Sequence, residues 1–267
     1  MDTLRQDLRF ALRTFVRTPG LSIALVLTFA LGVGATTAIF TVVDRVVLRP
    51  LPFPGSERVV VMCETNPRLA GVCVASPSNV ADWARSVPAL ESAGVMRDES
   101  VVAQIDGGSL GVHGGLATAG LFRALDMRPA LGRLFDDHDV DSGANHVVIL
   151  SDAFWRERFG ASTDVVGRDL MLDGRAMRII GVLPERAYIP IRDGIEVWLP
   201  ITAGIDDATK RSWRGFTALG RIAAGRTRKD VDAELDVVRG RLAAEYPASN
   251  AGWACEQKAC AITSPAQ

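Results

Sequence analysis

Residues that could support metal, nucleophilic or acid–base chemistry are few and scattered in this chain of 267 residues. The three histidines, His113, His138 and His146, lie near none of the four cysteines, and no cysteines form a Cys-x-x-Cys pair, so a zinc site has little support. The acidic run Asp136–Asp141 could attract a divalent cation, but it lacks the glycine and distal glutamate of an EF-hand loop. We interpret this run as a solvated loop.

Motifs of the common hydrolytic sites are also missing. The sequence contains no Walker A loop, no Gly-x-Ser-x-Gly elbow and no His-Glu-x-x-His pair. The run Gly111–Gly115 is rich in glycine, but it lies inside a strand pattern, so we predict a turn or bulge there. The five tryptophans are dispersed, as core packing would place them. We therefore expect no enzyme activity, no catalytic residue, no cofactor and no metal.

Composition indicates a folded protein. Hydrophobic residues make up 48% of the chain, charged residues 23%, and the net charge of −1 provides no electrostatic case for binding nucleic acid. Cys63 and Cys73 could close a disulfide across a short loop if the domain is exported, worth roughly 2–3 kcal/mol. Two unpaired thiols are an equally good interpretation.

The strongest signal is the uncharged apolar run Leu21–Phe40, whose apolar character continues to Val43. A helix rises about 1.5 Å per residue, so about 20 such residues cross a hydrocarbon core of about 30 Å. A cleaved signal peptide has a shorter apolar region of about 7–15 residues, and a buried soluble helix of this length would carry a polar stripe. We therefore predict one transmembrane helix over residues 20–46.

The preceding residues 1–19 predict an amphipathic helix on the membrane surface. Arg5, Arg9, Arg13 and Arg17 recur at every fourth position and share one helical face, opposite a mostly apolar face. Such basic groups face anionic lipid head groups. Positive charge before the span predicts a cytoplasmic N-terminus, and hence a single-pass protein of the bacterial inner (plasma) membrane with its main domain outside the cytoplasm.

The remainder of the chain, beyond a proline-rich connector, predicts an α+β domain. Short apolar runs predict strands, and polar residues with capping chemistry predict helix starts. The strands are expected at 59–62, 101–105, 110–117, 147–150, 170–172, 176–182, 197–199 and 216–223. The helices are expected after Ser76 (inner face Val80, Trp83, Ala84 and Val87), Thr118, Ser151 and Thr227, the last with Asp230 in a capping box.

Several short runs along the chain together resemble one family of membrane proteins. They are DLRFALR at 7–13, TPG at 18–20, ALGVGA at 30–35, LRPLP at 48–52, RPALGRLF at 128–135, VILS at 148–151, IGVLP at 180–184, VWLP at 197–200 and LAAEYP at 242–247. In this order they resemble bacterial ABC-transporter permeases of the MacB/FtsX type, and most of all the large duplicated permeases of acidobacteria. The resemblance extends to about Gly252.

The resemblance implies that residues 47–253 form a MacB-like periplasmic core domain with a porter-like lobe and a β-rich lobe. It also implies a separate cytoplasmic ABC ATPase, whose ATP hydrolysis moves the periplasmic domain for export or efflux. The N-terminal helix and the transmembrane helix would be the coupling parts. Membrane lipids and a second permease unit are the other implied partners, while the substrate stays open.

Two departures from the family matter. The tail, residues 254–267, has Cys255 and Cys260 where a strand is expected, and the chain stops before the further transmembrane helices of such permeases. We interpret the chain as the N-terminal part of an incomplete permease. The alternative is a membrane-anchored periplasmic module that regulates a cell-envelope partner without transport.

Overall fold

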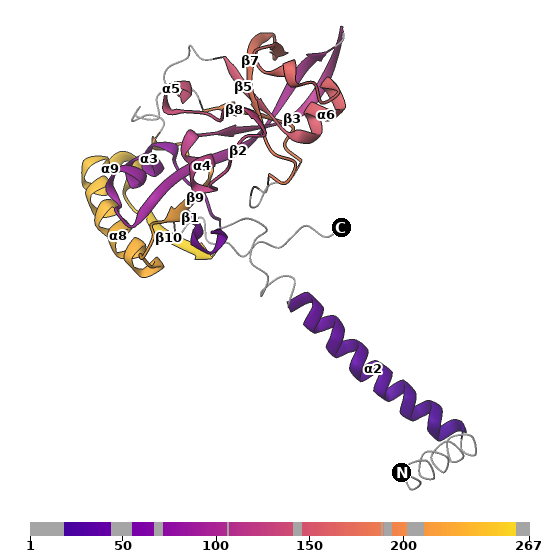
Figure 1. Cartoon of the computed structure of the whole chain (residues 1–267). Coiled ribbons are helices and arrows are strands. Elements are labelled where there is room, and N and C mark those ends of the chain that lie inside the picture. The colour runs from indigo at the N-terminus through magenta and orange to yellow at the C-terminus, as the bar shows by residue number, and fades with distance from the viewer. Residues whose placement is uncertain are drawn as a thin grey trace. The chain divides into compact units, whose positions relative to one another are not determined.

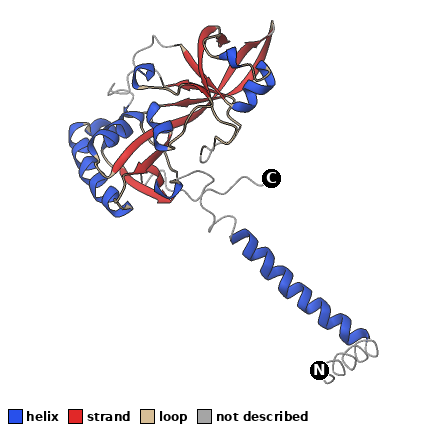
Figure 2. Ribbon diagram, viewed as in Figure 1, coloured by secondary structure: helices blue, strands red, loops and turns tan. Residues whose placement is uncertain are grey.

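The structure is a computed structural model that describes residues 19–43, 55–66, 72–105, 107–140, 146–187, 189, 194–201 and 211–259 (Figure 1). The chain divides into two units, Met1–Arg49 with Thr263–Gln267, and Pro50–Ile262. Helix α2 (Pro19–Val43) is the described part of the first unit, and a mixed α/β domain forms the second (Figure 2). The four arginines of the predicted surface helix, and the predicted connector, lie outside the described residues.

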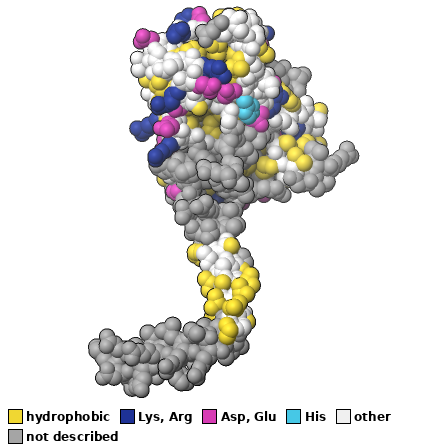
Figure 3. Space-filling view, turned by 90° about the vertical axis from the view of Figure 1, so that its right-hand side faces the viewer, with side chains coloured by type: hydrophobic (Ala, Val, Ile, Leu, Met, Phe, Trp, Pro, Cys, Tyr) yellow, Lys and Arg dark blue, Asp and Glu magenta, His cyan; other side chains and the backbone are white. Residues whose placement is uncertain are grey.

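Helix α2 is a continuous helix of 25 residues without a charged side chain. Its described apolar side chains are exposed, as the hydrophobic colouring of Figure 3 shows; Leu31, for example, is 72% exposed. The hydroxyls of Thr28, Thr36 and Thr37 donate to the carbonyl oxygens four residues earlier, at 2.7–2.8 Å, so the helix satisfies them internally. Judged on the described residues, no helix combines the length and apolarity needed to cross a membrane.

The domain is built on one sheet of ten described strands in the order β10-β1-β9-β2-β3-β8-β5-β7-β4, with β6 paired to β2 and β7. The β3–β8 and β5–β7 pairs are parallel, and the other pairs are antiparallel. The strands are β1 Val59–Thr65, β2 Leu90–Ile105, β3 Gly108–Ala117, β4 Leu131–Gly132, β5 Val147–Leu150, β6 Asp169–Leu172, β7 Arg175–Val182, β8 Val197–Pro200, β9 Thr217–Ile222 and β10 Ala254–Ala259. The helices are α3 Pro77–Ser86, α4 Ala119–Ala124, α5 Asp137–Val140, α6 Asp152–Phe159, α8 Arg228–Glu245 and α9 Pro247–Asn250, with 3-10 turns at Ser56–Arg58 and Thr163–Val165.

The long strand β2 belongs to two regions of this sheet. Its first part, Leu90–Met96, pairs with β9, and its second part, Met96–Ile105, pairs with β3. Helices α3, α8 and α9 gather beside the β1–β9–β10 region, whereas α6 lies by β3, β5 and β7 (Figure 1). The mixed α/β architecture expected from the sequence is therefore confirmed, and its two regions share one continuous sheet.

Side-chain alternation along β1 explains how the sheet is covered on both faces. Val60 and Met62 belong to an apolar cluster with residues of α3 and α8, and Val59 and Val61 belong to another with residues of α4. Successive strand residues point to opposite faces, so a run of consecutive apolar residues is what a strand covered on both sides requires. A third cluster lies in the other region and includes Phe154 of α6.

Two predicted helix caps are confirmed. The Ser151 hydroxyl accepts from the Phe154 amide at 3.2 Å, and Thr227 and Asp230 form the reciprocal capping box of α8. Thr118 precedes α4 as predicted, but its hydroxyl accepts from the Val95 amide at 3.0 Å, so it links α4 to β2 and does not cap the helix.

Two further expectations about the elements are wrong. Ala84, assigned to the inner face of α3, is exposed, because successive helical residues are about 100° apart and the face that buries Trp83 turns its neighbour to solvent. The predicted turn or bulge at Gly111–Gly115 is absent, since β3 keeps an unbroken register with β2 there. A Cβ atom on Gly115 would lie 2.7 Å from a ring carbon of Trp198, so close packing explains this glycine.

The tail was expected to lack a strand, and this is also wrong. β10 pairs antiparallel with β1 from Ala254 to Ala259. Main-chain hydrogen bonds to an open sheet edge need no particular side chains, so cysteines in place of the family pattern do not prevent strand formation. Cys260 lies outside the described residues.

Candidate functional site

The described residues contain no group of three or more His, Cys, Asp and Glu side chains placed to hold a metal ion. His113, on β3, lies 3.1 Å through Nδ1 from the Gly194 carbonyl oxygen and 4.0 Å through Nε2 from a carboxylate oxygen of Asp98. These contacts place His113 in a surface polar pair. The polar residues that the fold brings together most closely lie elsewhere, at the end of β1.

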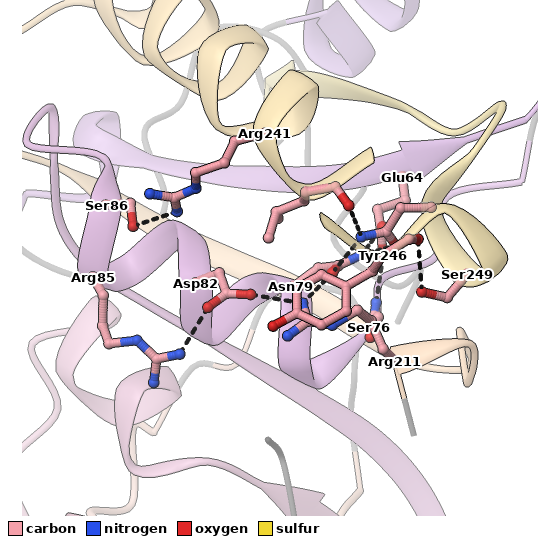
Figure 4. A network of polar contacts seen from close by, with 12 residues as sticks. Glu64, Ser76, Asn79, Asp82, Arg85, Ser86, Arg211, Arg241, Tyr246 and Ser249 are labelled. Atoms are coloured by element: carbon pink, nitrogen blue, oxygen red, sulfur yellow. Dashed lines mark hydrogen bonds and ion pairs between the residues drawn. The ribbon is translucent and has the colours of Figure 1, made fainter. Parts of the chain in front are cut away.

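Glu64 is the centre of that buried network, with only 2% of its surface exposed (Figure 4). Its carboxylate accepts from the Ser76 amide and from the Asn79 side-chain amide, each at 2.5 Å, and lies 3.2 Å from the guanidinium of Arg214. Burial raises the pKa of Glu64 above its ordinary value, while Arg214 and the two hydrogen bonds act in the opposite direction.

A second ion pair adjoins the first through Asn79. The Nη1 atom of Arg211 donates to Asp82 at 2.6 Å and to Asn79 at 2.7 Å, and the guanidinium lies 3.9 Å from the ring centre of Tyr246 (Figure 4). The network thus joins α3, β1 and the end of α8 through arginines that precede β9.

A disulfide lies directly beside this network. Cys63 and Cys73, the pair considered from the sequence, are bonded with their Cα atoms 4.8 Å apart. The bond ties β1 to the segment in which Val74 bridges Glu64 and Ala75 bridges Phe216. It therefore holds in place the residues that lead to the Ser76 amide, one of the donors to Glu64.

The acidic run was interpreted as a solvated loop, but its described residues, 136–140, form a structured turn that ends in α5, and Asp141 lies outside the described residues. Asp139 is 3% exposed and accepts a bidentate pair of hydrogen bonds from Arg133, at 2.5 and 2.9 Å. Burial acts to raise the pKa of Asp139, but the hydrogen bonds from Arg133 and from the Asp136 amide hold it below its ordinary value. The ion pair has a structural role, because both carboxylate oxygens of Asp139 are engaged by the protein itself.

Two open grooves also lie among the described residues of the domain. One, of about 340 Å³, lies against α4 and is lined by Glu91, Ser92, Ala119, Phe122, Arg123, Asp126, Met127, Leu134 and Phe135. The other, of about 410 Å³, lies at the start of α6 and is lined by Ser151, Asp152, Ala153, Leu183, Pro184, Glu185, Ala187, Ile189, Gly194, Ile195, Glu196 and Trp198. The Ser151 hydroxyl in the second groove is engaged as a helix cap, because it accepts a hydrogen bond from the Phe154 amide.

Residues 22–238 match the family of MacB-like periplasmic core domains. The chain belongs to this family. The matched range includes most of α2 as well as the sheet and helices up to the middle of α8.

Two solved structures share the fold of the domain. The periplasmic region of MacB from Actinobacillus actinomycetemcomitans superimposes with a TM-score of 0.53 at 14% identity, covering 74% of this chain and 88% of that one. The extracellular domain of the ABC-type transporter YknZ from Gram-positive bacteria gives 0.51 at 13% identity, covering 74% and 99%. No curated protein matches the chain by sequence.

The sequence alone assigned no functional role to the residues of the buried network of this MacB-like domain. The position of Glu64 could have indicated a buried ion pair, because this charged residue directly follows the apolar run of β1. A charge buried in a strand is tolerable only when it has a partner. Its partners could not be identified from the sequence, since Arg214 lies far along the chain from Glu64 and no local pattern connects them.

Proposed function

We propose that this chain is a membrane-anchored component of an ABC-type permease, whose MacB-like domain works outside the cytoplasm. The match to the MacB-like family over residues 22–238 is the observation that carries the proposal. The chain is not an enzyme in this proposal, and its part in transport is to respond mechanically to a separate ABC ATPase.

Helix α2 is the proposed anchor. At about 1.5 Å per residue its 25 residues extend for about 37 Å, which exceeds a hydrocarbon core of about 30 Å. The hydroxyls of Thr28, Thr36 and Thr37 have partners within the helix, as a lipid environment demands. In the full sequence of the helix, five more residues are apolar, namely Leu21, Leu25, Ile39, Val42 and Val43.

The coupling part is the basic segment before α2. In this proposal Arg5, Arg9, Arg13 and Arg17 lie at the cytoplasmic surface, where they contact lipid head groups and the ATPase. ATP hydrolysis then moves α2 and, through it, the extracytoplasmic domain, in support of export or efflux. A second permease unit completes the membrane part.

Site-directed labelling tests the anchor and its orientation. Replacing Cys255 and Cys260 with serine leaves only the bonded pair Cys63–Cys73, which does not react with a maleimide. Single cysteines are then introduced at Thr3, at Ala30 in α2 and at Ala84 on the exposed face of α3. A membrane-impermeant maleimide should label Ala84→Cys in intact cells, Thr3→Cys only after lysis, and Ala30→Cys only after detergent is added.

The three positions distinguish the competing arrangements. Labelling of Thr3→Cys in intact cells would show that the N-terminus lies outside the cytoplasm. Labelling of Ala30→Cys before detergent is added would show that α2 does not span the membrane. If Ala84→Cys reacted only after lysis, the domain would lie in the cytoplasm and the permease proposal would fail.

Coupling to an ATPase needs a second experiment. The tagged chain, purified in mild detergent, should retain an ATP-photolabelled subunit of the ABC class. Changing Arg5, Arg9, Arg13 and Arg17 to glutamate should abolish this retention, whereas the same change at four exposed arginines of the domain, Arg156, Arg168, Arg175 and Arg178, should not. A correctly inserted chain that never retains an ATPase would favour the module that regulates an envelope partner without transport.

A further inference from the structure

Strand β10 is the edge of the described sheet and pairs with β1 alone, from Val60↔Ala259 to Thr65↔Ala254. An edge strand shares its main-chain hydrogen bonds with one neighbour, so it leaves a sheet more easily than a central strand. Strand β1 would keep its pairing to β9 without it. Contacts outside the ladder therefore matter for how firmly β10 is held in place.

The segment just before β10 is held by Arg214. This side chain is 5% exposed, and it contacts three parts of the fold at once. It pairs with Glu64 at 3.2 Å, donates through Nη2 to the Asn250 side chain at 2.7 Å, and lies 4.1 Å from the ring centre of Trp253. Trp253 directly precedes β10, so Arg214 joins the start of that strand to the end of β1.

Arg211 repeats the arrangement three residues earlier. Its side chain is 4% exposed, pairs with Asp82 at 2.6 Å and lies over Tyr246 at the end of α8. Each arginine thus contacts a carboxylate of the β1–α3 part on one side and an aromatic ring of the C-terminal part on the other. Asn79 and Asn250 join the two halves, through an amide hydrogen bond of 3.0 Å.

The charges of this arrangement balance, with two carboxylates and two guanidiniums, all at most 14% exposed. Separating one buried pair leaves an uncompensated charge, which is costly, and neighbours in one network are energetically coupled. The two ion pairs are therefore expected to open together.

We propose that Glu64, Asp82, Arg211 and Arg214 form a clasp that holds the C-terminal segment from Tyr246 to Ala259 on the domain. Opening the clasp releases β10 as a unit, while the rest of the sheet stays folded. The clasp concerns the domain alone and is independent of whether the chain takes part in transport.

Amide hydrogen exchange of the full chain in detergent micelles tests the clasp. In Arg214→Ala, exchange of residues 254–259 should accelerate at least about tenfold, the change expected when one buried charged hydrogen-bond partner is lost. Exchange in β5 and β7, far from the clasp in the strand order, should stay within about twofold, because local opening does not require global unfolding.

Arg156→Ala is the matched control. Arg156 also pairs with a carboxylate, Asp152 at 2.6 Å, and lies over an aromatic ring, that of Trp155 at 5.6 Å, but its side chain is 57% exposed. It should leave exchange in β10 unchanged. Arg211→Ala, at the other half of the clasp, should accelerate β10 as Arg214→Ala does.

Two results would overturn the proposal. Exchange in β10 that is unchanged in a folded Arg214→Ala protein would show that the strand does not depend on the clasp. Equal acceleration in β5 and β10 would show that Arg214 contributes only to global stability. If Arg214→Ala does not fold, Arg214→Lys keeps a cation opposite Glu64 but loses the fork that reaches Asn250, and it must still accelerate β10 selectively.

Discussion

Replacing Gly120 with alanine should destabilise the domain, although alanine is the better helix former. Gly120 lies in the first turn of α4, which packs directly on the main chain of β2. A Cβ atom at Gly120 would lie 2.0 Å from the Ala93 carbonyl oxygen, whereas ordinary contacts begin at 3.4 Å. The helix would have to move away from the strand by more than 1 Å.

The cost follows from what moves with the helix. Leu121 and Phe122 of α4 are 0% and 1% exposed, so a displacement opens the apolar cluster around them. Overpacking of a well-filled core costs about 1–3 kcal/mol, and alanine recovers at most about 1 kcal/mol of helix propensity. We expect a net loss of about 1–2 kcal/mol, which lowers the midpoint of thermal unfolding by about 2–8 °C in a domain of this size.

Urea unfolding of the full chain in detergent micelles, followed by tryptophan fluorescence, measures this loss, because all five tryptophans lie outside α2. Gly240→Ala is the control for the propensity term. Gly240 lies in α8 with nothing within 4 Å of its added Cβ, so that change should stabilise the domain by about 0.5–1 kcal/mol. A Gly120→Ala protein as stable as the wild type would refute the close approach of α4 to β2.

Three other perturbations have calculable directions. Changing Cys63 and Cys73 together to serine should lower the free energy of unfolding by about 2–3 kcal/mol, and a reducing agent should shift the wild type equally without affecting the variant. Arg133 holds the pKa of Asp139 below 3.8, so the Asp139 carboxylate stabilises the folded state at pH 7. The difference in stability between the wild type and Asp139→Asn should therefore vanish as the pH falls through the folded pKa of Asp139. A difference in urea midpoints that stays constant with pH would contradict this. Burial raises the pKa of Glu64 above 4.5, so the folded state keeps this proton to higher pH than the unfolded chain does. The stability of the wild type should therefore decline as the pH rises from the unfolded pKa of Glu64 through its folded pKa. Glu64→Gln should not show this decline.

Elements with local determinants could be predicted from the sequence. The start of α8 depends on Thr227 and Asp230, three residues apart, and its buried face follows from apolar residues at helical spacing. The hairpin of β6 and β7 depends on its Asp-Gly turn, and the strand pairing of the structure agrees with it.

The first part of β2 could not be predicted in this way. Leu90–Ser100 contains several charged residues that hide the apolar alternation of a strand. Arg97, for example, is accommodated because its guanidinium lies 4.7 Å from the ring centre of Trp213, which is remote in sequence. The partners of Glu64 escaped prediction for the same reason, since burial of a charge is decided by residues that only the folded chain brings together.

The position of β1 in the chain connects the proposed anchor with the clasp. It is the first described strand after α2, and it lies between β9 and β10 in the sheet. Its far end contains Cys63, which the disulfide ties to the next segment, and Glu64, which pairs with Arg214. If α2 anchors the chain as proposed, any pull transmitted along the backbone reaches β1 before every other strand. The disulfide resists that pull covalently, whereas the clasp resists it through ion pairs, so of these two ties the clasp should yield first.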